Sequence, residues 1–289
     1  MEKLINKAAV LMEALPYIQK FKDEVFVIKF GGSAMEDEDL ITQTMRDIVL
    51  LECIGVHPVV VHGGGKAITA RLKELNIETR FVNGLRFTCE KTIDVVDDVL
   101  HNVINKTLVN AVVEQGGKGQ RISGKDVLKA EKTYSIAPDG TKSDVGFVGN
   151  IVSVDTQLIM AMAKSDIIPV IAPLGLGEDG QVFNINADTA ACEIAEALKA
   201  KKLVFLSDVP GILRDTKDEK SIISTIKVSE VDSMIKEGVI SGGMIPKIRS
   251  CLHAIEAGAE KVHMVDGRVR HSLLLEIFTD SGIGTEIVR

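Results

Sequence analysis

Lysines beside glycine turns are the first residues in this sequence that could do chemistry. Lys29 ends an apolar run and is followed by Gly31 and Gly32. A charge at the end of a buried strand is costly unless it has an anionic partner. Lys247 follows Gly242 and Gly243 and enters the first turn of a helical segment, where a cation opposes the helix dipole. Both positions favour an anionic ligand, although Lys29 alone also fits a structural lysine that reaches the surface.

The glycine run after His62 is the strongest indication of an anion site. Valines 59–61 lead into Gly63, Gly64 and Gly65, and a helical segment follows. A buried strand that opens through glycines onto a helix leaves backbone N–H groups unpaired at the positive end of the helix dipole. Glycine also lets a ligand approach the backbone without a Cβ in the way. The alternative is a tight turn without a ligand, and His62 itself fits a hydrogen-bonding residue at a strand end better than a ligand.

Two more segments carry polar side chains at the start or end of apolar elements. Asn184, Asn186 and Asp188 precede an apolar helical segment, where any one of them fits a helix cap. At a spacing of two, both amides could face one polar ligand while Asp188 holds a lysine in position. Residues 207–211 follow a strand and either line a nucleotide pocket or form a capped turn. The G-x-G-x-x-G pattern at 175–180 predicts a β-hairpin turn, because its glycines do not open a helix.

Alternating strands and helices must position these residues. The apolar patterns predict strands at residues 25–30, 57–62, 167–172, 202–206, 261–265 and 285–288. They predict helices at residues 39–52, 67–75, 91–114, 155–164, 187–199, 228–237, 245–257 and 271–278. Residues 120–151 are expected to form short antiparallel strands, with turns at Pro138-Asp139-Gly140 and at Gly146.

This order of elements predicts an α/β fold, a three-layer αβα sandwich with a mainly parallel open sheet. Ligands in such folds bind at the carboxyl ends of the strands. The loops after residues 30, 62, 172 and 206 should therefore share one edge of the sheet.

An extra amphipathic helix precedes the first strand. Leu4, Ala8, Leu11, Leu15 and Ile18 recur at helical spacing, and Pro16 should kink or break the helix. Its apolar stripe needs a partner, which is either the body of the same chain or another subunit.

Composition excludes several classes of protein. The chain has 289 residues, a net charge of −7, no Trp and only 4% aromatic residues, which disfavours nucleic-acid binding. Its four cysteines have no metal-ligand or redox spacing, and no metal site is expected. No apolar run could span a bilayer, and the charged N-terminus does not resemble a secretory signal, so we expect a cytoplasmic protein without membrane contact.

Six motifs occur in order along nearly the whole chain, and together they resemble those of the amino acid kinase family. They are Lys29-Phe30-Gly31-Gly32, His62-Gly63-Gly64-Gly65, Asn83-Gly84-Leu85-Arg86, Asn184-Ile185-Asn186-Ala187-Asp188, Ser207-Asp208-Val209-Pro210-Gly211 and Gly242-Gly243-Met244-Ile245-Pro246-Lys247. The third and fourth motifs separate the chain from the carbamate, aspartate and UMP kinases of that family.

The resemblance implies phosphorylation of the γ-carboxylate of N-acetyl-L-glutamate by ATP with Mg²⁺, a step of arginine biosynthesis, with the metal held mainly by the nucleotide phosphates. It implies that Lys29 and Lys247 neutralise the moving phosphoryl group, that Asp188 orients both lysines, and that Gly32 and Gly64 donate N–H groups to the γ-phosphoryl region. The implied substrate-binding residues are Gly64, Gly65, Arg86, Asn184 and Asn186, with Arg86 pairing the α-carboxylate. The implied nucleotide-binding residues are Gly31, Gly32, Ser207, Asp208, Gly211 and Lys247.

The implied chemistry agrees with the residues. A carboxylate nucleophile is already ionised at neutral pH, so no general base is needed. Positioning and electrostatics then carry phosphoryl transfer. We expect an acetylglutamate-binding lobe at 23–177 and a nucleotide-binding lobe at 178–289, which close to exclude water.

Two further features resemble the arginine-inhibited, hexameric branch of the family. The segment 1–22 implies an oligomerisation helix that interlaces with a neighbour and links dimers into a trimer of dimers. The run from Glu260 to Thr285 implies a feedback site for L-arginine, formed by Tyr17, Lys202, His263, Glu276 and Gly282. The alternative is that His271 and Glu276 are only cap and surface residues of the last helix.

Two other functions compete with the kinase. One is a non-catalytic, arginine-sensing regulatory protein on a kinase fold, which the intact Lys29, Asp188 and Lys247 disfavour. The other is a dinucleotide oxidoreductase, which the position of the glycine pattern at 175–180 disfavours.

Overall fold

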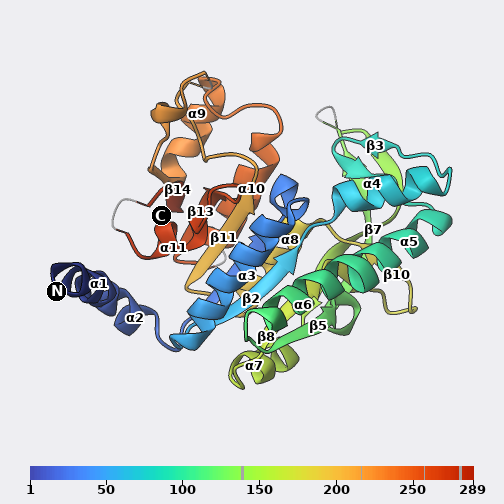
Figure 1. Cartoon of the computed structure of the whole chain (residues 1–289). Coiled ribbons are helices and arrows are strands. Elements are labelled where there is room, and N and C mark those ends of the chain that lie inside the picture. Colours follow the sequence, from blue (N-terminus) through green and yellow to red (C-terminus); the bar gives the residue numbers. More distant parts are fainter. Residues whose placement is uncertain (138–139, 216, 257, 280–281) are drawn as a thin grey trace.

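An eight-stranded, mainly parallel sheet forms the centre of the computed structural model, and helices cover both of its faces (Figure 1). The structure describes residues 1–137, 140–215, 217–256, 258–279 and 282–289. In spatial order, the strands are β12 (Thr225–Lys227), β14 (Thr285–Val288), β13 (Lys261–Asp266), β11 (Lys202–Ser207), β1 (Val25–Phe30), β2 (His57–His62), β8 (Ile168–Ala172) and β5 (Gly119–Ser123). Among these, β13 and β14 pair antiparallel, and β12 pairs parallel with β14. The predicted α/β sandwich with a mainly parallel sheet is confirmed.

The alternation of side chains along β1 explains the three layers. Val25 and Val27 belong to one buried core, whereas Phe26 and Ile28 belong to the other. The first core includes side chains of α7 (Thr156–Ala163), α8 (Ala187–Ala197), α9 (Val231–Lys236) and α10 (Met244–Glu256). The second core includes side chains of α3 (Glu38–Cys53), α4 (Gly65–Glu74), α5 (Glu90–Asp97), α6 (Asn105–Glu114) and α11 (Ser272–Ile277). Because successive strand residues point to opposite faces, a strand that is apolar throughout requires a helix layer on each side.

The predicted single helix at 91–114 is interrupted. Its middle, Asp98–Ile104, is a π-helix between α5 and α6. The residue pattern stays apolar across the junctions, so periodicity alone did not reveal the change in winding. The expected span of the helix is confirmed, but not its regularity.

The prediction for 120–151 was partly wrong. Gly119–Ser123 pairs parallel with β8 and is the edge strand of the main sheet. The antiparallel part is β6 (Leu128–Ile136) with β7 (Lys142–Val154), which close a small barrel with β9 (Leu174–Leu176) and β10 (Val182–Asn184). The expected turn at Pro138-Asp139 lies outside the described residues. The pair β9 and β10 is antiparallel, which confirms the hairpin expected at 175–180.

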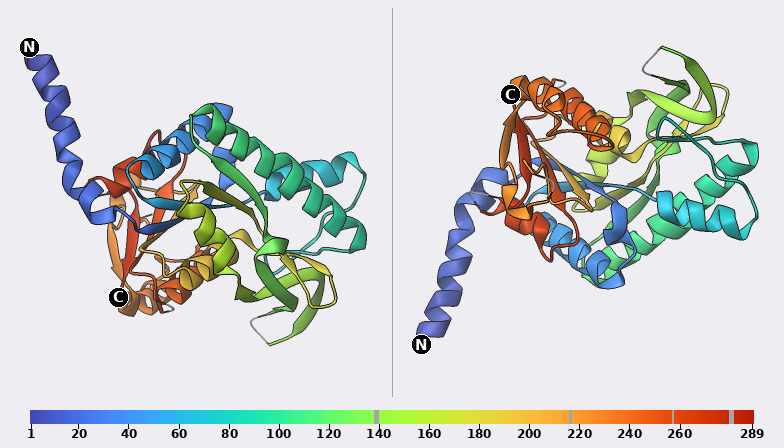
Figure 2. Two further views of the ribbon diagram at one scale, coloured as in Figure 1. Left: turned by 90° about the horizontal axis from the view of Figure 1, so that it is seen from below. Right: turned by 90° about the horizontal axis from the view of Figure 1, so that it is seen from above.

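The N-terminal segment forms two helices, α1 (Glu2–Glu13) and α2 (Leu15–Phe21). Pro16 lies in the first turn of α2, which confirms the expected break. Helix α1 projects away from the body of the chain (Figure 2). Leu11 is 74% exposed and Val10 63%, so the apolar stripe of α1 does not pack on its own body. The side chain of Leu4 lies outside what the structure describes.

Candidate active site at the carboxyl edge of the sheet

The loops after four parallel strands meet at one edge of the sheet, as expected. Phe30 of β1 is in register with His62 of β2 and with Leu206 of β11, and β8 pairs parallel with β2. A cavity of about 260 Å³ lies at this edge. Its walls include Lys29, Gly32, Gly63, Gly64, Gly65, Arg86, Asn184, Asn186 and Asp188.

Asp188, in the first turn of α8, faces two lysines that come from different elements. Lys29 Nζ lies 2.8 Å from Asp188 Oδ1, and Lys247 Nζ lies 3.6 Å from Oδ2. Burial would raise the pKa of Asp188, but the two ammonium groups outweigh it and hold the pKa below its ordinary value. Asp188 is therefore a charged carboxylate that brings two cations to the edge of the cavity.

Close contacts surround the glycines beside Lys29 and His62. A Cβ on Gly31 would stand 2.5 Å from Lys29 Nζ, so the ammonium group that pairs with Asp188 would have to shift. A Cβ on Gly64 would stand 2.5 Å from Leu100 Cδ2 and 2.7 Å from Ile104 Cδ1, both in the π-helix. Gly64 therefore packs against the π-helix, and Leu100 lines the cavity with it.

His62 is a buried, hydrogen-bonded residue at the end of β2, as the sequence indicated. Its Nδ1 lies 2.8 Å from the carbonyl oxygen of Gly63, and its Nε2 lies 3.2 Å from Asn105 Nδ2. Burial lowers the pKa of His62 to about 4, so the ring is neutral near pH 7. Asn105 was missed in the sequence, because nothing local distinguishes it from other polar residues of its helix.

Arg86 is buried in the wall of the cavity with part of its guanidinium unsatisfied. Nη2 donates hydrogen bonds of 2.8 Å to the Gly65 carbonyl and to Thr69 Oγ1. The guanidinium carbon lies 4.8 Å from the centre of the Phe81 ring. Nη1 is buried and has no hydrogen-bond partner among the described residues. Burial also lowers the pKa of Arg86. A buried cation with an unpaired donor suits an anionic ligand group.

The two predicted amides behave differently. Asn184 Nδ2 donates to Thr88 Oγ1 at 3.2 Å, and Thr88 in turn donates to the Arg86 carbonyl at 2.9 Å. Asn186 is the N-cap of α8, since its Oδ1 accepts from the N–H groups of Asp188 and Thr189. Both amides line the cavity, but the oxygen of Asn186 is already used. Thr88, fully buried, was not predicted.

Of the residues assigned to the nucleotide, Gly32 lines this cavity, and the loop with Asp208 lies beside it. The backbone nitrogen of Asp208 lies 3.3 Å from where a Cβ on Gly32 would stand, so the two loops are adjacent. Ser207 Oγ is buried and has no partner within the described chain. Gly211 has a φ of +136°, a backbone conformation that favours glycine, and it packs against Thr285. These residues thus form a neighbouring part of the same edge.

Comparisons with known proteins identify the fold. The model of the amino acid kinase family matches residues 24–266. The chain belongs to the amino acid kinase family. The relatives it resembles include acetylglutamate kinases from Heliobacterium modesticaldum, 47% identical over 100% of both chains, and from Caldicellulosiruptor saccharolyticus, 51% identical over 99% of this chain and 98% of that one.

Solved structures agree with this family assignment. An N-acetylglutamate synthase from Neisseria gonorrhoeae, complexed with coenzyme A and N-acetyl-glutamate, matches with a TM-score of 0.86 and 26% identity. The match covers 98% of this chain but only 63% of the synthase, so this chain spans less than two thirds of that protein. A carbamate kinase from Giardia matches with a TM-score of 0.66 at 14% identity, which reflects the fold alone. None of the described helices is long and apolar enough to cross a membrane.

All five residues expected at the regulatory site line a second cavity of this amino acid kinase, distant from the first. Tyr17, Lys202, His263, Glu276 and Gly282 surround about 330 Å³ between α2, the amino ends of β11 and β13, and α11. Glu276 is only 7% exposed, so the alternative in which it is a surface residue is wrong. His271 is the N-cap residue of α11 by position, but its ring contacts Asp47 at 2.7 Å instead of capping the helix.

A relay of polar contacts crosses this second cavity. Lys202 Nζ lies 2.8 Å from His263 Nε2, and His263 Nδ1 lies 2.6 Å from Glu276 Oε1. The other oxygen of Glu276 accepts from the N–H groups of Ile283 and Gly284. Burial lowers the pKa of Lys202 to about 8. Burial would raise the pKa of Glu276, but these hydrogen bonds hold it below its ordinary value.

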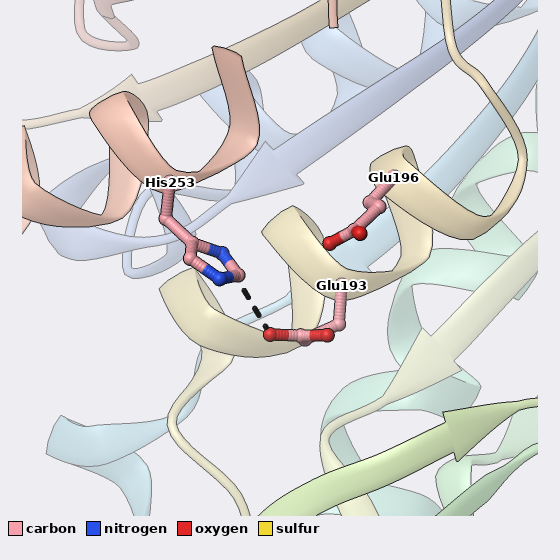
Figure 3. Close-up of side chains that lie close together, drawn as sticks. All are labelled: Glu193, Glu196 and His253. Atoms are coloured by element: carbon pink, nitrogen blue, oxygen red, sulfur yellow. Dashed lines mark ion pairs between the residues drawn. The ribbon is translucent and has the colours of Figure 1, made fainter. Parts of the chain in front are cut away.

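A third polar cluster joins the helices that carry Asp188 and Lys247. Figure 3 shows the ring of His253, on α10, directed toward Glu193 on α8, with Glu196 one turn further along. His253 Nδ1 lies 3.8 Å from Glu193 Oε1. Burial raises the pKa of Glu193. We interpret the cluster as a contact between α8 and α10 that lies outside both cavities.

Proposed function

We propose that this amino acid kinase transfers the γ-phosphoryl group of ATP to the γ-carboxylate of N-acetyl-L-glutamate in arginine biosynthesis. Full-length relatives at 47% and 51% identity bear the name acetylglutamate kinase. The observation that carries the proposal is the ion-pair triad of Lys29, Asp188 and Lys247, in which Lys29 and Asp188 line the cavity and Lys247 pairs with Asp188. The unpaired Arg86 donor in the wall of that cavity supplies a partner for a substrate carboxylate.

The proposed mechanism uses positioning and charge. The attacking carboxylate is ionised at neutral pH and needs no base. Lys29 and Lys247 offset the charge that develops on the moving phosphoryl group, and Asp188 aligns them. The N–H groups of Gly32 and Gly64, which carry no side chain to block them, donate to the phosphoryl oxygens.

Substrate selection follows from the remaining wall of the cavity. Arg86 Nη1 would pair the α-carboxylate of acetylglutamate, while Gly64, Gly65, Asn184 and Asn186 contact the rest of the molecule. The Nδ2 groups of both amides are the donors best suited to the acetyl carbonyl, because the oxygen of Asn186 is already used as a cap. A free α-amino group would bring a cation next to Arg86, which disfavours unacetylated glutamate.

The nucleotide would bind along the neighbouring part of the edge, near Gly31, Gly32, Ser207, Asp208 and Gly211. The Asp188 carboxylate already pairs with two lysines, so its charge is used to position them. Mg²⁺ therefore fits here as part of MgATP, held mainly by the phosphates, where it offsets their charge. We also propose that the lobes 23–177 and 178–289 close during turnover, and that the enzyme acts in the cytoplasm, where biosynthetic ATP is consumed.

The test is a coupled assay of ADP release with N-acetyl-L-glutamate, L-glutamate, L-aspartate and carbamate, each at the same concentration. We expect turnover with N-acetyl-L-glutamate at least 100-fold above the others, because the cavity is built to pair polar groups of that substrate. Turnover with L-glutamate alone would contradict the proposed specificity. Absence of ADP release with every substrate, combined with arginine binding, would support the non-catalytic regulatory protein instead.

We further propose that the second cavity binds L-arginine and inhibits the enzyme. The cavity combines a buried carboxylate, Glu276, with a buried cation, Lys202. These charges complement a guanidinium and a carboxylate. Tyr17 belongs to α2, so this cavity is continuous with the N-terminal helices.

The exposed apolar side chains of α1 are the basis for proposing a trimer of dimers as the assembly. Ile5, Val10, Leu11 and Met12 are each at least 60% exposed. A helix with so much apolar surface in water is stabilised when an equivalent helix of another subunit covers it. We propose that α1 helices interlace in pairs between dimers.

A further inference from the structure

The ring of His62 joins the glycine turn to the interior of the sheet. It is completely buried, with Nδ1 at 2.8 Å from the Gly63 carbonyl oxygen and Nε2 at 3.2 Å from Asn105 Nδ2. Asn105 Nδ2 also donates to the Val170 carbonyl at 2.8 Å, in the neighbouring strand β8. The glycine turn is therefore connected through two side chains to a fixed point in the sheet.

The partners determine which nitrogen of His62 carries the proton. A carbonyl oxygen can only accept, so Nδ1 must donate its N–H to Gly63. Nε2 is then a lone-pair acceptor, and the Asn105 amide N–H supplies the donor that it needs. A neutral ring satisfies every contact, whereas a protonated ring would place an N–H against the Asn105 amide donor.

The Gly63 carbonyl controls the direction of the next N–H group. The carbonyl of Gly63 and the N–H of Gly64 belong to one planar peptide unit, which is trans and therefore points them in opposite directions. The carbonyl points to His62, inside the protein. Gly64 lines the first cavity, and its N–H donates no hydrogen bond to any described residue. Leu100 and Ile104 of the π-helix pack against the same glycine.

We propose that His62 is a positioning residue for phosphoryl transfer, which fixes the Gly63–Gly64 peptide so that the Gly64 N–H points at the reacting anion. This role rests on the proposed kinase function. His62 does not contact the substrate, and it acts only through the peptide that it holds.

Three substitutions separate positioning from packing. His62→Asn places an amide N–H near the position of Nδ1, so it keeps the donor to Gly63. His62→Gln extends an amide to the position of Nε2 and loses that donor, and His62→Leu loses both contacts. We expect kcat to fall about 100-fold in the His62→Gln and His62→Leu variants. Loss of one N–H donor at a developing oxyanion lowers kcat by this order of magnitude. We expect His62→Asn to restore kcat to within about tenfold of the unmodified enzyme, with KM for N-acetyl-L-glutamate changed less than about threefold in all three.

Two controls complete the experiment. Ile159→Ala removes a fully buried side chain from α7, so it should lower Tm without lowering kcat at the assay temperature. Asn105→Ala leaves the ring in place but removes its anchor, and we expect an intermediate loss of kcat. Equal kcat losses for the Asn, Gln and Leu variants, in step with Tm, would overturn the proposal, as would full kcat in the Gln and Leu variants. Failure of the unmodified enzyme to release ADP would instead overturn the kinase function.

Discussion

Lys29 Nζ lies 2.8 Å from Asp188 Oδ1, although the two residues are far apart in the chain. The pair joins β1 to the first turn of α8, and Lys247 completes it from α10. Without the carboxylate, the two ammonium groups would repel each other and move apart. The geometry of both cations thus depends on Asp188.

The first prediction concerns this dependence. Asp188→Asn should lower kcat by about 10²–10³-fold, because both lysines lose the charge that aligns them while they face the same anion. KM for N-acetyl-L-glutamate should change much less. Steady-state kinetics with both substrates varied will measure the two effects. The matched control is Glu193→Gln on the same helix, outside the cavity, and a comparable kcat loss there would contradict the assignment.

Arg86 provides a prediction for binding. Arg86→Lys should raise KM for N-acetyl-L-glutamate by about tenfold or more. The planar guanidinium of Arg86 donates to Gly65 and Thr69 through Nη2 and leaves Nη1 for the substrate, and an ammonium group cannot do both. KM for ATP should stay within about twofold. Arg80→Lys, which changes an arginine stacked on Phe87, is the control. Parallel changes in both KM values would argue against a role limited to the acetylated substrate.

Deletion of α1 separates assembly from regulation. Removing residues 1–13 takes away the exposed stripe but keeps Tyr17 and Phe21, which line the second cavity. We expect the full assembly to become dimers in light scattering, while isothermal titration still detects L-arginine. Deletion of residues 1–22 should abolish both the full assembly and the detectable binding of L-arginine. An unchanged mass after either deletion would show that α1 does not connect the dimers.

The proposed inhibition by L-arginine should depend on pH because of Lys202. Burial lowers the pKa of Lys202 to about 8, so the side chain loses its charge as pH rises through that value. The carboxylate of L-arginine then loses its cationic partner, and the half-inhibitory concentration should rise about tenfold between pH 7 and 9. In Lys202→Arg the cation persists, so the rise should be much smaller. Equal pH profiles for both proteins would exclude Lys202 as the titrating group.

His62 should contribute a pH-dependent part of the folding stability. The ring titrates near 6.5 when unfolded and near 4 in the folded protein, so between these values the unfolded state binds the extra proton. Stability is therefore complete above pH 6.5 and is lost as pH falls toward 4, by up to about 3 kcal/mol. Urea unfolding at several pH values should show this loss in the unmodified chain and a smaller loss in His62→Gln. Identical slopes would mean that other groups carry the effect.

The sequence predicted the parallel strands and the edge they share, because apolar runs that end in glycines have few other interpretations. The sequence also indicated three charged residues, because each one stands out from its neighbours. They are Lys29, Asp188 and Lys247. Asn105 and Thr88 were not found, because each acts through a buried contact with a residue far away in the chain. The barrel was also missed, since β6 and β7 pair across a turn while β9 and β10 close it from a later segment.

The π-helix at Asp98–Ile104 makes the winding of this helix a constraint of its own. A π turn holds one residue more than an α turn, and each residue of an α-helix turns the chain by about 100°. Deleting a single residue here would let the helix rewind regularly with Asn105 still directed toward His62. A substitution that made the intact segment adopt regular α winding would instead rotate Asn105 by about 100° and shift the register between two layers of the protein.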